Sequence, residues 1–118
     1  MHELGFCDGI VEAVQRRAVG RKVKRLQVRV GVLHRLDHRA FQQAFSVAAN
    51  GTEAEDAIVD VVSILARSRC RVCQNESEGA DLEVVCARCG GMDIEVSGGD
   101  EIVLEWLEYE TAANRKLV

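Results

Sequence analysis

The first third of the chain contains two hydrophobic periods in succession. Near the start, apolar residues recur at steps of three and four, which predicts an amphipathic helix of about sixteen residues with one wide buried side. The apolar positions of this helix are Leu4, Cys7, Val11, Val14 and Ala18. From residue 23 to residue 33 the period changes to two, which is typical of a half-buried strand. The apolar positions of this strand are Leu26, Val28, Val30 and Val32.

A second helix is predicted after Asp37, a residue type that favours the N-cap position. Its apolar face carries Phe41, Ala44, Phe45 and Ala48. The segment that follows is ambiguous, because Thr52 begins a capping-box pattern, whereas the β-branched residues between 58 and 64 favour a strand. Residues 102–109 are predicted as a last strand and residues 111–118 as a loose tail.

Four cysteines form two Cys-x2-Cys pairs in the second half of the chain. The pairs are Cys70/Cys73 and Cys86/Cys89. Each pair directs two thiolates at one spot, so the two pairs together supply the four soft ligands of a closed tetrahedral site. Zinc is the natural occupant, although the spacing also suits iron or an iron–sulfur cluster. A closed site has no position for a substrate, so we interpret this centre as structural and not catalytic.

Disulfide bonds are a poor alternative for these cysteines. The chain has an odd number of cysteines, five, and we find no apolar signal segment at its start. Cys7 lies on the apolar face of the first helix, and we interpret it as a small core residue. The residues between the two pairs are too polar to build a core. Metal binding therefore has to supply much of their folding free energy.

These elements predict an α+β fold. We expect a small sheet of about three strands with two helices on one face, together with an inserted zinc-ribbon lobe that carries the two cysteine knuckles. The expected domains are an α/β domain of residues 1–66 and 98–118 and an inserted zinc-binding domain of residues 67–97. Within the lobe, residues 82–85 and 94–96 are predicted as short strands.

Composition and charge narrow the classes of function. The chain has 118 residues, of which 47% are hydrophobic and 29% are charged, and its net charge is −4. No apolar run approaches the roughly eighteen residues of a membrane span, so we expect a cytoplasmic protein without membrane contact. Basic residues concentrate between Arg16 and Arg29, which suits an acidic partner or a phosphate backbone. The simpler interpretation is a solvated surface that pairs mostly with the acidic end of the chain.

The first three residues, Met1, His2 and Glu3, offer a second kind of metal site. The amine of Met1, the deprotonated backbone nitrogen of His2 and the His2 imidazole can form fused chelate rings around one metal. The backbone nitrogen or the carboxylate of Glu3 can complete the set. Such nitrogen-rich sets suit Ni(II) and Cu(II), and protons compete with the metal for the amine and the imidazole. Taken alone this signal is weak, because a single histidine is more often an exposed polar residue.

The order of these features resembles the HypA/HybF family of nickel-insertion proteins, which mature NiFe-hydrogenases. The resemblance rests on MHE at the start, RVGVL at the end of the first strand, AFQQAF in the second helix, NGTEAEDA after it and the double Cys-x2-Cys. It implies a metallochaperone with two metal sites. Transported Ni(II) would bind at Met1, His2 and Glu3. Structural Zn(II) would bind at Cys70, Cys73, Cys86 and Cys89. The resemblance also implies that residues 57–66 form a strand.

The same resemblance implies a set of partners. Members of the family work with a nickel-binding GTPase, deliver to the large subunit of NiFe-hydrogenase and, in some cases, support urease maturation. This chain has no phosphate-binding loop, so any nucleotide hydrolysis belongs to the partner, and we expect no enzymatic activity of its own. Nucleic acid is not expected as a partner, and a homodimer is compatible with the sequence.

A zinc-ribbon module that binds nucleic acid or a transcription complex is the alternative function. Its footprint would be the basic cluster Arg16–Arg29, and its binding would fall steeply with salt. The negative net charge weighs against this function, and so does the presence of only one Trp and one Tyr, because little aromatic surface is left for base stacking.

Overall fold

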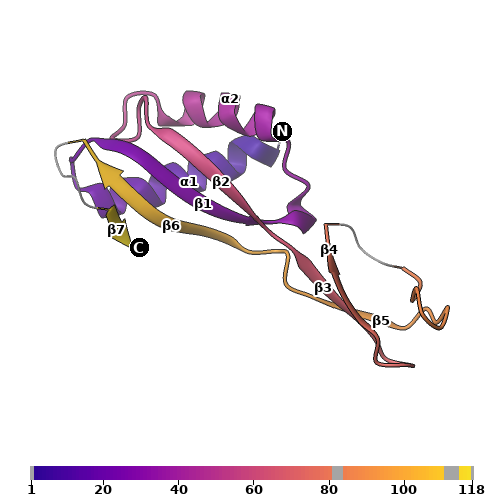
Figure 1. Ribbon diagram of the computed structural model, residues 1–118. Coiled ribbons are helices and arrows are strands. Elements are labelled where there is room, and N and C mark those ends of the chain that lie inside the picture. The colour runs from indigo at the N-terminus through magenta and orange to yellow at the C-terminus, as the bar shows by residue number, and fades with distance from the viewer. Residues whose placement is uncertain (1, 81–83, 111–114, 118) are drawn as a thin grey trace. The chain divides into compact units, whose positions relative to one another are not determined.

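The computed structural model describes residues 2–80, 84–110 and 115–117. Its elements are α1 (His2–Ala18), β1 (Val23–Gly31), the 3-10 turn η1 (Val32–His34), α2 (His38–Ala49), β2 (Ile58–Ile64), β3 (Ala66–Cys70), β4 (Glu76–Gly79), β5 (Ile94–Ser97), β6 (Ile102–Tyr109) and β7 (Arg115–Leu117). They form a four-stranded sheet with the order β2-β1-β6-β7 and a three-stranded sheet with the order β4-β3-β5 (Figure 1). The two helices and the small sheets confirm the predicted α+β class.

The chain divides into two compact units. The first consists of Met1–Arg29, Leu36–Val62 and Val103–Val118, and the second consists of Val30–Arg35 and Ser63–Ile102. The second unit extends beyond residues 67–97 on both sides and also includes η1. This division into compact units does not test the domain bounds given from the sequence, which therefore stay a prediction.

The core of the first unit is built by its two helices and its sheet. The buried apolar residues of α1 recur at the predicted helical steps and are Cys7, Ile10, Val11, Val14 and Ala18. Leu26 and Val28 of β1 are fully buried. Phe41 and Phe45 of α2 stack with their ring centroids 6.2 Å apart. Figure 1 shows both helices on the same side of this sheet, as the sequence predicts. Leu4 departs from the predicted buried stripe, because 39% of its surface is exposed.

Three residues of the basic cluster Arg16–Arg29 form ion pairs among the described residues of the first unit. The pairs are Arg16–Glu12 (2.9 Å), Arg25–Asp60 (2.7 Å) and Arg29–Glu105 (3.1 Å). Solvent-exposed pairs of this kind contribute only about 0–1 kcal/mol each. Glu105 belongs to the acidic end of the chain, whereas Glu12 and Asp60 do not, so only one of these three pairs agrees with the expected pairing to the acidic end.

The sheet of the first unit has one strand more than expected. β7 pairs antiparallel with β6, with Trp106 opposite Leu117 and Glu108 opposite Arg115. The sequence predicts a loose tail over residues 111–118, of which residues 111–114 and 118 lie outside the described part. A three-residue strand carries too little periodicity to be recognised, so its conformation depends on its pairing with β6.

The second unit contains an antiparallel sheet in which β3 is the central strand, flanked by β4 and β5. β5 agrees with the prediction for residues 94–96, and β2 and β3 account for the strand expected over residues 57–66. β4 is unexpected, since its sequence Glu-Ser-Glu-Gly has low strand propensity. Of the strand predicted at residues 82–85, residues 82 and 83 lie outside the described part, and Val84 and Val85 form a bend.

Within the second unit, two glycines allow the backbone at the start of η1 to lie close to the backbone of the loop that contains Gly99. The backbone N–H of Gly31 donates to the carbonyl of Glu101 at 2.7 Å, and that of Leu33 donates to the carbonyl of Gly99 at 2.8 Å. A Cβ at Gly31 would collide with the backbone of Gly99, which itself has a φ of +81°. Only glycine permits so close an approach of two backbone segments.

Replacing Phe41 by alanine tests the core of the first unit. Phe41 is fully buried, so we expect Phe41→Ala to lower the free energy of unfolding by about 3–5 kcal/mol. Urea unfolding followed by the fluorescence of Trp106, the single tryptophan, measures this change. Val47→Ala is the control on the same helix, because Val47 is 71% exposed and its truncation should cost less than about 0.5 kcal/mol. Equal effects of both substitutions would contradict the described core.

Candidate metal centre

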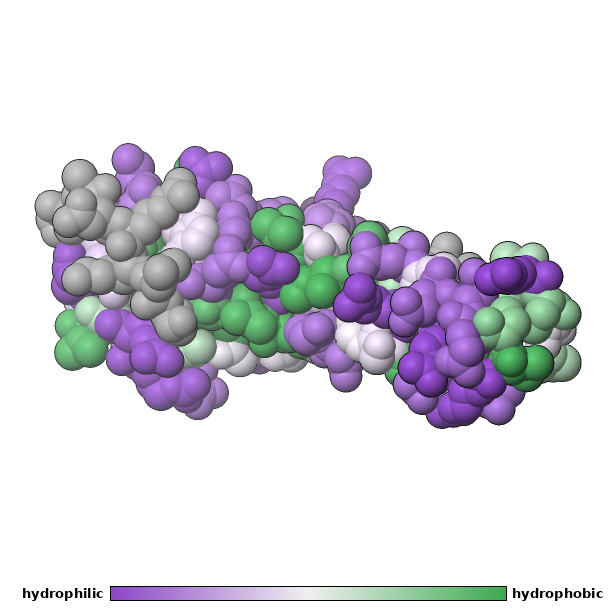
Figure 2. Space-filling model, turned by 60° about the horizontal axis from the view of Figure 1, so that its bottom comes forward, coloured by the Kyte–Doolittle hydropathy of each residue, from purple (hydrophilic) through white to green (hydrophobic). Residues whose placement is uncertain are grey.

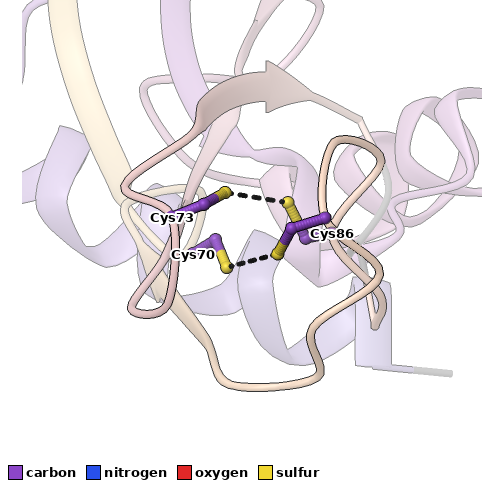
Figure 3. Close-up of side chains that lie close together, drawn as sticks. Cys70, Cys73 and Cys86 are labelled. Carbon is purple, nitrogen blue, oxygen red and sulfur yellow. Dashed lines mark hydrogen bonds between the residues drawn. The ribbon is translucent and has the colours of Figure 1, made fainter.

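Four cysteine thiols of the second unit converge on one point. The Sγ atoms of Cys70, Cys73, Cys86 and Cys89 all lie within 4.8 Å of one another. In Figure 3 the thiols of one knuckle face those of the other across a small space between two loops. The distances are 3.6 Å between the sulfurs of Cys70 and Cys89 and 3.6 Å between those of Cys73 and Cys86. Tetrahedral zinc with Zn–S bonds of about 2.3 Å holds its sulfurs about 3.8 Å apart. The cluster therefore fits Zn(II).

Each cysteine pair lies in a turn of the same design. In the first knuckle, the N–H of Gln74 donates to the carbonyl of Cys70 at 2.8 Å. In the second knuckle, the N–H of Gly90 donates to the carbonyl of Cys86 at 2.9 Å. Gln74 and Gly90 both have positive φ, of 65° and 76°. This left-handed residue reverses the chain directly after the second cysteine, so that both thiols of a pair point to the same side. The sequence spacing and the observed turns thus lead to the same four-thiol arrangement.

The protonation of the thiols shows that the cluster is suited to a cation. The backbone N–H groups of Cys89 and Arg88 lower the pKa of the Cys86 thiol to about 6, because they stabilise its thiolate. At Cys89 the N–H of Gly91 acts in the same direction, but the neighbouring thiols of Cys73, Cys70 and Cys86, together with burial, outweigh it and raise the pKa of Cys89 to about 12. Four thiolates this close repel one another, so all four ionise together only around a metal ion.

The second unit has a small apolar core. Its buried apolar residues in the described part of the chain are Val30, Ala66, Cys70 and Cys86, of which two belong to the thiol cluster. The apolar residues Val72, Val84 and Met92 are 66%, 74% and 79% exposed. In Figure 2, the unit appears at the right with hydrophobic surface open to solvent beside densely packed hydrophilic side chains. So little burial leaves metal binding as the main source of folding free energy for this unit.

The predicted nickel residues are described only in part. Met1 lies outside the described residues, and His2 is placed as the first residue of α1. Glu3 is buried, with 7% of its surface exposed, and its Oε2 accepts a hydrogen bond from the backbone N–H of Asp37 at 3.4 Å. Sequence reasoning did not predict this contact. The first N–H groups of a helix have no acceptor within the helix, so the backbone nitrogens of His2 and Glu3 suit a metal-binding role.

The chain is similar to known proteins over nearly its whole length. A family model described as hydrogenase/urease nickel incorporation, metallochaperone, HypA, matches residues 1–109. The chain belongs to the HypA family. The hydrogenase maturation factors HypA of Rippkaea orientalis and Nostoc sp. are each 32% identical over 110 residues, which is 93% of this chain and 96% of each relative.

Two solved structures share the fold. The solution structure of the Ni metallochaperone HypA from Helicobacter pylori has a TM-score of 0.62 at 23% identity and covers 91% of this chain and 96% of that chain. A second HypA solution structure has a TM-score of 0.57 at 22% identity and covers 92% and 93%. As a HypA family member, this chain is a nickel-incorporation metallochaperone of hydrogenase maturation, and its four-cysteine cluster fits a structural zinc. None of the described helices is both long and apolar enough to cross a membrane.

Serine substitution in the cluster tests the dependence of the second unit on metal. We expect Cys86→Ser to reduce bound zinc from about one ion per chain to a small fraction, because a hydroxyl is a far weaker zinc ligand than a thiolate. Hydrogen exchange at β3 and β5 should then become fast, while α1 and α2 stay protected. Cys7→Ser is the matched control, since Cys7 lies outside the cluster and should leave zinc content unchanged. Protected β3 amides in zinc-free protein would contradict the expectation.

Proposed function

We propose that this chain binds Ni(II) at its amino terminus and releases it to NiFe-hydrogenase during maturation. The observation that carries the proposal is the family match, which begins at residue 1 and so includes the candidate donors. These donors are the amine of Met1, the backbone nitrogen and imidazole of His2, and Glu3. The start of α1 at His2 supports it, since the N–H groups there have no intrahelical acceptor. Nitrogen donors of this kind suit Ni(II).

The second part of the proposal assigns the zinc ligands and the domains. Zinc is held by Cys70, Cys73, Cys86 and Cys89. Four protein ligands close the site, so the ion stabilises the fold and does no catalysis, and the chain acts without an enzymatic activity of its own. We assign nickel binding to residues 1–66 and 98–118 and zinc binding to residues 67–97. The division into two compact units supports this assignment, with bounds that differ by a few residues.

The proposed partners follow from the role of a nickel donor. They are a nickel-binding GTPase and the large subunit of NiFe-hydrogenase, with urease maturation factors as a second client system. The family description names both hydrogenase and urease, and the similar relatives are hydrogenase maturation factors, which favours hydrogenase. The proposal places the protein in the cytoplasm. The ion pairs of Arg25 and Arg29 argue against the nucleic-acid alternative, because they reduce the free positive charge of its footprint.

A nickel titration of the zinc-loaded protein tests the amino-terminal site. We expect about one Ni(II) per chain and at least tenfold weaker binding for His2→Ala, since that variant loses a ring nitrogen from the chelate. Nucleotides should have no effect on affinity. His38→Ala is the control, because it removes an exposed histidine of α2. Calorimetry or competition with a metal indicator gives the affinities. If His2→Ala and His38→Ala bind nickel equally well, the amino terminus is not the site.

The pH dependence of nickel binding provides a separate test of the same donors. An α-amine titrates near pH 8 and an imidazole near 6.5, so both take up protons as the pH falls from 7.5 to 6. Protons then compete with Ni(II), and we expect the affinity to fall by at least about tenfold over this range. The same titration repeated at several pH values measures it. A pH-independent affinity would rule out the amine and the imidazole as donors.

A further inference from the structure

Glu3 is the one charged residue that is buried within the described part of the chain. Burying a carboxylate is costly unless hydrogen bonds compensate for the lost water. Its Oε2 accepts a hydrogen bond from the backbone N–H of Asp37, at a distance of 3.4 Å. Asp37 is the N-cap of α2, so the carboxylate lies at the N-terminus of a second helix, where the helix dipole favours negative charge.

The contact completes a helix cap that is only half formed by local sequence. In a capping box, the N-cap side chain accepts from the N–H of the third helical residue, and an acidic side chain at that third position returns a bond to the N-cap N–H. Asp37 makes the first bond, from the N–H of Ala40 at 3.0 Å. Ala40 has no carboxylate to return the second. Glu3, from the other helix, supplies it.

The rest of the first turn of α1 has little packing to hold it. Leu4 is 39% exposed and borders, with Glu3, a shallow hollow of about 310 Å³ lined on the α2 side by Ala40, Ala44 and Val47. The first buried apolar residue of α1 is Cys7, one full turn after Glu3. The hydrogen bond of Glu3 is therefore the anchor nearest to the start of the chain among the described contacts.

We propose that Glu3 is a positioning residue for the amino-terminal nickel site. Its carboxylate completes the cap of α2 and fixes the first turn of α1, and its backbone nitrogen, not its carboxylate, is left to the metal. The inference rests on the proposed function, and it favours the backbone nitrogen over the carboxylate as the donor at this residue, because Oε2 is already engaged with Asp37. A chelate made of backbone nitrogens binds more tightly when its backbone is held in place before the metal arrives.

Two substitutions of Glu3 separate positioning from ligation. Glu3→Gln keeps an oxygen that accepts from the Asp37 N–H, whereas Glu3→Ala removes it. We expect nickel affinity within about threefold of the unmodified protein for Glu3→Gln and about tenfold weaker for Glu3→Ala. X-ray absorption at the nickel edge should give the same donor set for both variants. Glu12→Gln is the control, since it removes an equal charge from an exposed position of α1.

Hydrogen exchange in the absence of nickel measures directly how well the hydrogen bond between Asp37 and Glu3 protects the Asp37 amide. We expect the amide of Asp37 to exchange at least about tenfold faster in Glu3→Ala than in the unmodified protein, and at a similar rate in Glu3→Gln. Exchange in α1 beyond Cys7 should not change in either variant, so a general loss of structure is distinguished from the loss of one anchor.

Three results would overturn the proposal. If both Glu3 variants lose nickel equally and the nickel loses an oxygen donor, the carboxylate is a ligand. If neither variant alters nickel affinity or Asp37 exchange, the contact positions nothing. If the unmodified protein binds no nickel, the proposed function fails and this inference fails with it. Faster Asp37 exchange in Glu3→Ala would then show that the contact exists and that the error lies in the function.

Discussion

Mutual repulsion among four thiolates is the constraint on which the second unit depends. The turns that hold Cys70, Cys73, Cys86 and Cys89 place their sulfurs within 4.8 Å, where four negative charges coexist only around a cation. In the described part of the chain, the surrounding sheet has few buried apolar residues, so it has little stability of its own. A metal ion reverses the sign of the interaction, because it attracts all four thiolates at once. Without metal the thiols keep enough protons to avoid that repulsion, so these side chains hold the unit together only when the metal is bound.

The two units differ in what stabilises them, and this difference suits a protein that carries one metal and retains another. A core that includes Phe41, Leu26 and Val14 stabilises the first unit without metal, so the proposed nickel ion at the chain start could bind and leave while the fold persists. In the second unit, release of zinc would cause the unit to unfold. Under the proposed function, retention of zinc and exchange of nickel would have a common origin in the distribution of apolar residues along the chain.

Features set by local sequence were predictable, and features set by distant pairing were not. The knuckles, α1 and the N-cap Asp37 follow from spacing, period and residue type within a few positions. β4 and β7 are short and poor in strand-forming residues, so their conformation comes from β3 and β6. Gln74 takes a left-handed conformation that sequence would assign to glycine, as at Gly90. There the turn geometry demanded by two thiols overrides residue preference.

The contact between Glu3 and Asp37 is set by distant pairing, so the local sequence around either residue does not predict it. Read locally, Asp37 followed by Ala40 is an incomplete capping box, and Glu3 is an acidic residue in a first helical turn. Each observation is unremarkable alone, because the missing half of the cap lies 34 residues away. The two observations together support the proposal that the side chain of Glu3 serves the structure while its backbone nitrogen serves metal binding. A carboxylate that ligated nickel through Oε2 would have to give up its hydrogen bond to Asp37 at each loading, whereas ligation through a backbone nitrogen leaves that hydrogen bond in place.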